Sequence, residues 1–504
     1  MPEPSVDSVV LDGRSLTTAE VGAVAREQAP VRLAEAARAR NAAAAEVLQD
    51  LMDGGTPIYG ATTGVGAFRS REVPPRERSG HQLRLLRSHA CGAGRPLPAD
   101  RLRAAMVVRA NQLGAGGAGL SDELLGALVA ALNAGFLPFA RELGSLGTGD
   151  LTVLAEIALG LLGEGRAWRG GEAVAAQSAL AGAGLVAPRL GPRDGIAFMS
   201  SNAASIGHAA LVAVDADRLL TAALAVAALS FMAAGADPAV FDPRIHAARA
   251  HPGQVAVAAR MRELLGADAA SEPRNGPRAA VHDPYPFRAL AQVDGATLDA
   301  QTELDAVLAV ELNAAGENAL VRAGPAAALP NANFHAGSLA LGLDRLRAAL
   351  AQSSSLVAAR VSALLDPGLM GLPAALAARP GSDSGAMIVE YTAHAAAADV
   401  RLLAAPVTAQ TATVGGGIES HASFAPFAAR RTQDALESAA VAVATELVVA
   451  VRALRMRGLA PSGTAAGSLF AAAAGRLDAD LADRALSDDV EAARRLLLEE
   501  RPSE

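Results

Sequence analysis

The segment over residues 144–151 is the most informative stretch of this 504-residue chain. It places the β-hydroxyl of Thr148 between Gly147 and Gly149, directly before Asp150. In such a tripeptide the nitrogen of the third residue can attack the carbonyl carbon of the first, provided that the third residue is glycine. Loss of the middle hydroxyl as water would then leave an electrophilic ring. The alternative is an ordinary turn, in which Asp150 accepts amide hydrogens at the start of the apolar helix that follows.

Five other segments carry polar or aromatic side chains that could surround such a loop. They are Tyr59-Gly60-Ala61-Thr62-Thr63-Gly64-Val65-Gly66, Ser88-His89-Ala90-Cys91-Gly92, Val281-His282-Asp283-Pro284-Tyr285-Pro286-Phe287-Arg288, Asn333-Phe334-His335 and Ile418-Glu419-Ser420-His421. With the triad loop, they resemble the motifs of the histidine and aromatic amino acid ammonia-lyases, and they occur in the family's order. The Ser88-His89 segment is similar to the histidine branch. One match alone would carry little weight, whereas a series in family order indicates the fold.

The resemblance implies a mainly α-helical fold, a long-helix bundle of the ammonia-lyase (fumarase/aspartase-like) type with a smaller, loop-rich N-terminal part. We predict an N-terminal part over residues 1–201 with the tyrosine loop and the altered triad. A central helical bundle over residues 202–475 and a C-terminal helical segment over residues 476–504 would follow. The family also implies a homotetramer with shared active sites, because its sites combine loops from several subunits.

Three catalytic residues are implied by the resemblance. Tyr59 corresponds to the residue that transfers protons, and Tyr285 would assist that transfer or position the substrate. Glu419 would contact a polar or cationic substrate side chain, as in the histidine branch. Each of these residues also has a plain structural explanation, since a tyrosine in a glycine-rich loop is often only packed there.

Four residues are expected to bind the substrate. Arg288 would grip the substrate carboxylate with its planar guanidinium. His89 would contact the substrate side chain, and Phe334 would line the pocket. Ser200 stands where the family has the asparagine that holds the oxygen of the electrophile ring, and it is a shorter, weaker replacement.

The departures from the family pattern gather around the electrophile. The family's Ala-Ser-Gly triad is replaced by Gly147-Thr148-Gly149, and the loop looks one residue short. Threonine would yield an ethylidene group whose methyl crowds the reactive carbon. Asn202 lies two residues beyond Ser200, and we expect a helix to point its amide elsewhere. Two glutamines of the family pattern are replaced by Ala203 and Ile418.

We therefore predict an ammonia-lyase-like enzyme that acts on a small, carboxylate-bearing, amino-acid-like substrate by tyrosine-based acid–base elimination. The side chain of the substrate would be histidine-like, because of Ser88-His89. We expect no external cofactor, no metal and no imidazolone prosthetic group made from residues 147–149. One alternative is an electrophile-free lyase, cyclase or conjugate-addition enzyme of specialised metabolism. Another is a pseudoenzyme that binds a ligand or partner through the same pocket.

Composition agrees with a large, helical enzyme. The chain is 51% hydrophobic but only 3% aromatic, so its core must be built mainly from small and aliphatic side chains. A net charge of −8 gives no basic surface for nucleic acid or anionic lipid. The single cysteine, Cys91, excludes an intrachain disulfide, which fits the cytoplasm, and we expect its side chain to be buried. The richness in Ala, Arg and Gly indicates a high-GC bacterial source.

Helical periodicity dominates the chain. We predict helices over residues 31–48, 105–113 and 432–452, and a strand over residues 8–11. The uncharged run over residues 219–236 is long enough to cross a membrane. Because it is rich in alanine and flanked by charged residues, we interpret it as a central core helix of an all-helical protein.

Overall fold

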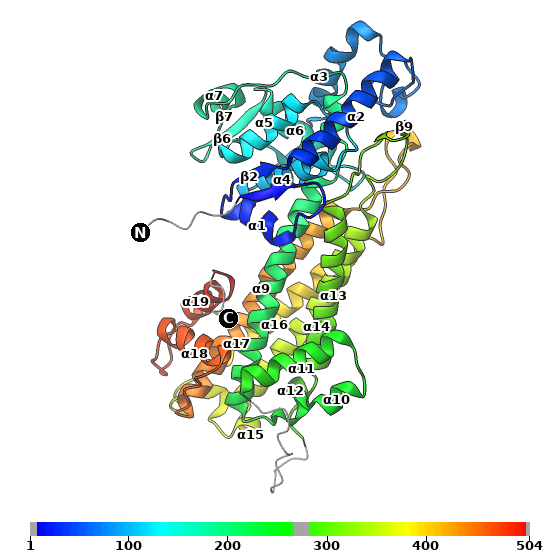
Figure 1. Cartoon of the computed structure of the whole chain (residues 1–504). Coiled ribbons are helices and arrows are strands. Elements are labelled where there is room, and N and C mark those ends of the chain that lie inside the picture. Colours follow the sequence, from blue (N-terminus) through cyan, green and yellow to red (C-terminus); the bar gives the residue numbers. More distant parts are fainter. Residues whose placement is uncertain (1–7, 267–281, 500–504) are drawn as a thin grey trace. The chain divides into compact units, whose positions relative to one another are not determined.

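The computed structural model describes residues 8–266 and 282–499, which are mainly helical (Figure 1). This confirms the predicted fold class. The chain forms two compact units. Unit 1 comprises the residues up to Val214, Asp305–Leu343 and Pro406–Arg430, and unit 2 comprises Asp215–Leu304, Asp344–Ala405 and the residues from Arg431 onward.

Four long helices have residues in both units: α9 (Ala203–Ala234), α13 (Leu290–Glu311), α14 (Gly337–Leu365) and α17 (Ala425–Met456). The linear division predicted at residues 201 and 475 therefore differs from the division into units. Each unit is assembled from stretches that are far apart in the sequence, and a pass along the chain does not reveal which stretches pack together.

Unit 1 holds most of the short strands and the loops that carry the motifs. Its helices are α1 (Thr18–Arg26), α2 (Glu35–Asp53), α3 (Arg78–His89), α4 (Ala99–Ala115), α5 (Asp122–Asn133), α6 (Leu151–Leu161), α7 (Ala176–Gly182) and α8 (Asp194–Met199), with short 3₁₀ turns η1 (Gly66–Phe68), η2 (Pro75–Glu77) and η5 (Gly415–Gly417). Its strands are β1 (Val9–Leu11), β2 (Val31–Leu33), β3 (Ala93–Pro96), β4 (Leu137–Pro138), β5 (Arg141–Leu143), β6 (Arg166–Arg169), β7 (Glu172–Ala175), β8 (Leu320–Ala323) and β9 (Ala326–Leu329). They form the parallel pair β1-β2, the antiparallel pairs β3-β5 and β8-β9, and the antiparallel sheet β4-β6-β7.

The predicted helices at residues 105–113 and 432–452 are confirmed as parts of α4 and α17, and the strand near residue 8 is β1. The helix predicted over residues 31–48 is wrong at its start, because Val31–Leu33 pairs with Val9–Leu11 as strand β2. A strand of only three residues gives too short a hydrophobic pattern for the sequence to reveal this pairing. The predicted burial of Cys91 is also wrong, since its side chain is exposed.

Helix α4 lies at the centre of unit 1, and every residue from Leu102 to Gly114 is buried. Helix α9 packs very closely on it at Gly207. A Cβ atom at this glycine would come within 2.7 Å of the carbonyl carbon of Ala104. Small residues therefore let the helices approach closely, as the composition predicts.

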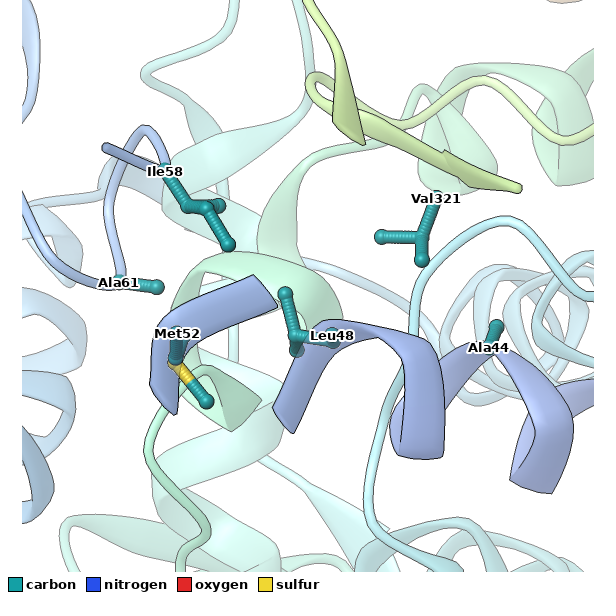
Figure 2. Packing of buried hydrophobic residues seen from close by; sticks show 6 residues of the cluster. All are labelled: Ala44, Leu48, Met52, Ile58, Ala61 and Val321. Carbon is teal, nitrogen blue, oxygen red and sulfur yellow. The ribbon is translucent and has the colours of Figure 1, made fainter. Parts of the chain in front are cut away.

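A small hydrophobic cluster anchors the loop that carries Tyr59. Figure 2 shows Leu48 and Met52 of α2 beside Ile58 and Ala61, the residues that flank this tyrosine. All four side chains are at least 96% buried, and Val321 of β8 and Ala44 complete the cluster. Burying these apolar groups fixes the backbone on both sides of Tyr59, since each well-buried aliphatic side chain contributes about 1.5–3 kcal/mol.

Unit 2 is built from the remaining parts of the long helices and several shorter ones. These are η3 (Pro238–Phe241), α10 (Pro243–Ala247), α11 (Pro252–Leu265), α12 (Tyr285–Arg288), α15 (Pro367–Met370), η4 (Ala374–Leu376), α16 (Met387–Leu403), α18 (Ala465–Arg476) and α19 (Ser487–Glu499). Arg360 of α14 and Glu446 of α17 form a bidentate ion pair at 2.7 and 2.9 Å, and both side chains are at least 99% buried. Ser230 donates to the same carboxylate, which links α9 to this pair.

One helix within the described part of the chain, α14, is long and apolar enough to cross a membrane. Its most apolar window is 67% buried by the rest of the protein. Residues 219–234, part of the run interpreted as a core helix, belong to α9, which is largely buried along that stretch.

Candidate functional site

The Gly147-Thr148-Gly149 triad lies between strand β5 and helix α6, in a loop that only glycine can form at two positions. The φ angles of Gly147 and Gly149 are 84° and 95°, in the left-handed region that other residues rarely adopt. A Cβ atom at Gly147 would lie 2.0 Å from the hydroxyl oxygen of Ser423. The alanine of the family triad therefore does not fit at this position without moving the segment that carries Ser423.

Two distant segments hold the triad loop by hydrogen bonds. The hydroxyl of Ser423 donates to the carbonyl oxygen of Gly147 at 2.8 Å, and the amide of Phe424 donates to the carbonyl oxygen of Leu146 at 2.8 Å. From the other segment, the amide of Ala336 donates to the carbonyl oxygen of Gly147 at 3.4 Å. We refer to the segments over residues 333–336 and 419–424 as the clamp.

Asn202 is the residue that connects the triad to the junction between helices α8 and α9. Its side-chain oxygen accepts from the amide of Gly149 at 3.0 Å, and its side-chain nitrogen donates to the carbonyl oxygen of Phe334. The prediction that a helix would point this amide elsewhere is wrong. Asn202 lies one residue before α9 begins, where its backbone carbonyl accepts from Ile206, so it is not yet on the helical path.

Thr148 is half-buried and faces the clamp. Its hydroxyl donates to a carboxylate oxygen of Glu419 at 2.9 Å, and its backbone pairs with His335 in an isolated antiparallel bridge. His335 in turn makes a ring-to-ring hydrogen bond, from its Nε2 to Nδ1 of His421 at 2.9 Å. Thr148, Glu419 and the two histidines thus form one polar cluster, although they come from three separate segments.

The buried carboxylate of Asp150 secures the loop from behind. Asp150 is the residue before α6, but its carboxylate does not cap that helix, which corrects the sequence-based interpretation. It accepts instead from the amide and the hydroxyl of Ser205 at 2.6 and 2.9 Å, in the first turn of α9. Burial raises the pKa of the Asp150 carboxyl to about 6, while the hydrogen bonds from Ser205 lower it.

Tyr59 lies in unit 1 on a loop that leads into η1. Its phenol oxygen accepts from the amide of Gly66 at 3.0 Å, and η1, which begins at Gly66, packs beside η5 just before Glu419. Fully buried Gln82 of α3 supports this loop, since its amide donates to the carbonyl oxygen of Gly60 at 2.8 Å. The oxygen of the same side chain accepts from the amide of Ile196 in α8.

The other residues proposed for substrate binding in unit 1 are His89, Phe334 and Ser200. His89 ends helix α3, and its Nδ1 lies 2.8 Å from the carbonyl oxygen of Leu85. A carbonyl can only accept, so Nδ1 carries a hydrogen. Phe334 is half-buried in the clamp. Ser200 is buried, and its hydroxyl accepts from the amide of Asn318, so Asn202 and not Ser200 contacts the triad. The substrate-binding roles of these residues stay predictions.

Tyr285 and Arg288 belong to unit 2, where they form the short helix α12. Tyr285 is 68% exposed, and the guanidinium carbon of Arg288 lies 5.6 Å from the centre of its ring. The Nε of Arg288 donates to the carbonyl oxygen of Asp283 at 3.0 Å, which orients the guanidinium. Their predicted roles in proton transfer and carboxylate binding stay predictions. Part of their motif, Val281, lies outside the described residues.

Several residues of the site escaped the sequence analysis. Gln82, Ser423 and the His335–His421 pair had no predicted role, and like Asn202 they act through hydrogen bonds between segments far apart in the chain. The two histidines stood within recognised motifs, which was the only signal for them. A lone buried glutamine or serine gives no signal before the topology is known.

Comparison with known proteins places these features in a family. Residues 16–474 match the family model described as aromatic amino acid lyase. The chain is 34% identical over 487 residues to a histidine ammonia-lyase of Treponema denticola, covering 96% of each chain. Among solved structures, it is similar to tyrosine aminomutase from Streptomyces globisporus, with a TM-score of 0.90, 30% identity and 97% of each chain covered. It is also similar to the ergothioneine degrading enzyme ergothionase from Treponema denticola, in complex with desmethyl-ergothioneine sulfonic acid. That match has a TM-score of 0.90 and 27% identity, and it covers 97% of this chain and 98% of the other.

The raised pKa of Asp150 predicts a pH-dependent contribution to stability. The carboxyl titrates near 3.8 when exposed and near 6 when folded, so folding favours its protonated form. Its contribution is fully present below pH 3.8 and is lost as the pH rises through 6. The free energy of unfolding of the wild type, relative to Asp150→Asn, should therefore fall by on the order of 3 kcal/mol between pH 4 and 7. Denaturant unfolding of both proteins across this range measures the difference, and a constant difference would contradict the assignment.

Proposed function

Because the chain belongs to the aromatic amino acid lyase family, we propose that it is a carbon–nitrogen lyase that works without an electrophile made from Gly147, Thr148 and Gly149. The observation that carries the proposal is the hydrogen bonding of the loop over residues 147–149. Cyclisation needs the nitrogen of Gly149, the carbonyl of Gly147 and the departure of the Thr148 hydroxyl. Each of these groups has a partner: Asn202, Ser423 and Glu419, respectively.

The substrate must then supply a better leaving group than a primary amine. A family electrophile acts by bonding to the lone pair of the substrate amine, and this activates the nitrogen to leave. A quaternary ammonium has no lone pair to donate, but it departs directly as a neutral tertiary amine. An enzyme without the electrophile is therefore matched to a substrate whose α-nitrogen is already fully alkylated.

We propose an α-trimethylammonium carboxylate with an imidazole-type ring as the substrate class. Ergothioneine is such a betaine, with a thiolated imidazole ring, and a similar solved structure is described as an ergothioneine degrading enzyme. In this chain, the ring of His89 and the carboxylate of Glu419 would contact the ring of the substrate. Arg288 would bind the carboxylate through two charge-assisted hydrogen bonds.

The elimination requires one proton transfer and one bond cleavage. Tyr59 would remove the proton from the β-carbon, and the electron pair of that C–H bond would form the new carbon–carbon double bond. The C–N bond breaks at the same time, and its electron pair leaves with the neutral tertiary amine. The products are an α,β-unsaturated acid and trimethylamine.

We further propose that the active protein is a homotetramer in the cytoplasm. Tyr285 and Arg288 lie in unit 2, while Tyr59 and the triad lie in unit 1. The resemblance to the family predicts that loops from several subunits combine in each site. The exposure of Tyr285 in the single chain is consistent with a position that another subunit covers.

A conventional histidine ammonia-lyase is the second candidate, because a relative of this name covers nearly the whole chain. A matched pair of substrates distinguishes the two candidate functions. L-Histidine and its trimethyl betaine differ only in methylation of the α-nitrogen. We expect trimethylamine and the unsaturated acid from the betaine, and likewise from ergothioneine, with no ammonia from histidine, as followed by NMR. Ammonia release from histidine at a comparable kcat/KM would contradict the proposal. Binding without turnover of any of them would favour the pseudoenzyme.

Thr148→Val tests the role of the hydroxyl in the loop. Valine keeps the shape of threonine but has no group that can leave as water, and it loses the hydrogen bond to Glu419. Removing a hydrogen bond to a charged group should lower kcat/KM for the betaine by roughly tenfold to a hundredfold. Thr148→Ser is the matched control and should behave as the wild type. Complete loss of turnover in the valine variant alone would indicate a catalytic role for a dehydrated Thr148.

Tyr59→Phe tests the assignment of the base. Phenylalanine keeps the ring but removes the hydroxyl that accepts from the Gly66 amide, so the free energy of unfolding should fall by only about 1 kcal/mol. General acid–base groups contribute about 10²–10⁴-fold to rate, and kcat for the betaine should fall by this amount. Near wild-type turnover in the Tyr59→Phe variant would exclude Tyr59 as the proton-transfer residue.

A further inference from the structure

The hydrogen bond between His335 and His421 joins the two segments of the clamp. It connects Nε2 of His335 to Nδ1 of His421 at 2.9 Å, and the ring centres lie 5.1 Å apart. On one side, the backbone of His335 pairs with Thr148. On the other side, His421 lies two residues beyond Glu419, whose carboxylate accepts from the Thr148 hydroxyl. The pair therefore closes a ring of contacts around the triad loop.

The loop that carries Glu419 is fixed at its base and needs a second attachment near its end. Val414 and Glu419 exchange backbone hydrogen bonds at 2.8 and 3.3 Å around the glycines of η5. These glycines, Gly415–Gly417, all have positive φ angles and carry no side chains that could pack. Within this half-exposed loop, the ring of His421 reaches the opposite segment of the clamp.

The ring of His335 lies close to the backbone of Gly337. A Cβ atom at Gly337 would lie 3.1 Å from Cε1 and 3.2 Å from Nδ1 of His335. Glycine at this first residue of α14 therefore lets the ring lie against the helix, with Nε2 directed to His421. One ring must donate and the other must accept, so the bond requires that at least one of the rings is neutral.

A metal site is the main alternative for two facing histidines. Zinc in proteins is usually held by at least three protein ligands. Among the described residues, no group of three or more His, Cys, Asp or Glu side chains is arranged to hold a metal ion. The direct 2.9 Å contact between the ring nitrogens is that of a hydrogen bond.

We propose that His335 and His421 are positioning residues that act through Glu419. Their hydrogen bond sets the spacing between the two segments of the clamp and so holds the Glu419 carboxylate against Thr148. In catalysis, this fixes the carboxylate where it contacts the substrate, a consequence that rests on the proposed function. The positioning itself does not depend on which substrate is bound.

Replacing the histidines with asparagine or glutamine provides a matched test, because each replacement either keeps or removes the hydrogen bond between positions 335 and 421. The side-chain nitrogen of asparagine is as many bonds from Cβ as Nδ1 of histidine, and that of glutamine as many as Nε2. His335→Gln and His421→Asn therefore keep a hydrogen-bonding atom at the required place. His335→Asn and His421→Gln have similar polarity but misplace that atom. In the double variant His335→Gln/His421→Asn, the side-chain nitrogen of one amide can donate to the side-chain oxygen of the other, which keeps the bond without either ring.

Hydrogen–deuterium exchange of the intact protein measures the clamp without any substrate. In His335→Asn and His421→Gln, we expect amides in the peptides that contain Thr148 and Glu419 to exchange roughly threefold to tenfold faster, as for the loss of one hydrogen bond. In the matched variants and the double variant, exchange should stay within about twofold of the wild type. Thermal unfolding temperature, as a control, should be similar in all five variants.

Equal exchange in the matched and mismatched variants would overturn the proposal, whether all are fast or all are slow. For the betaine, the mismatched variants should lower kcat with little change in KM, and the matched ones should restore it. If no substrate is turned over but the exchange pattern holds, the positioning role stands and the proposed function fails. If the betaine is turned over but the exchange pattern fails, the proposed function stands and the positioning role of the two histidines fails.

Discussion

The buried guanidinium of Arg109 organises the part of the molecule that faces the triad. It forms an ion pair with Glu317 at 3.0 Å, and both side chains are fully buried. It also donates to the carbonyl oxygens of Ala197 and Phe198 at the end of α8. Burying two charges is costly unless they are paired and hydrogen-bonded, so this network strongly favours one position of α8. Because Asn202 follows directly, its contacts with Gly149 and Phe334 depend on that position.

This constraint positions the contacts that hold the triad loop. Asn202 and Asp150 hold it from the side of α9, while Ser423 and Ala336 hold it from the clamp. Glycine at position 147 lets the segment that carries Ser423 pack closely on the loop, because there is no space for a side chain beside Ser423. The same contacts engage the atoms that cyclisation would use. Under the proposed function, chemistry at this site falls to the side chains around the loop and to the leaving group of the substrate.

The fold class could be predicted from the sequence because six motifs in family order define a scaffold, and long apolar and amphipathic stretches define its helices. The units could not, since their boundaries fall inside helices such as α9 and α17. At the site, the motifs identified Thr148 and Glu419, whose hydrogen bond now links them. The direction of the Asn202 side chain and the partner of Asp150 depend on where α9 begins, within one or two residues. Sequence patterns do not resolve helix ends to that precision.

The central claim is that the backbone over residues 147–149 is an ordinary peptide in the active protein. The most direct measurement is the mass of the proteolytic peptide that contains Thr148, from protein with demonstrated turnover of the betaine. The account predicts the mass calculated from the unmodified sequence. A deficit of two water molecules confined to this peptide would show that the triad has cyclised and dehydrated, and it would contradict the claim.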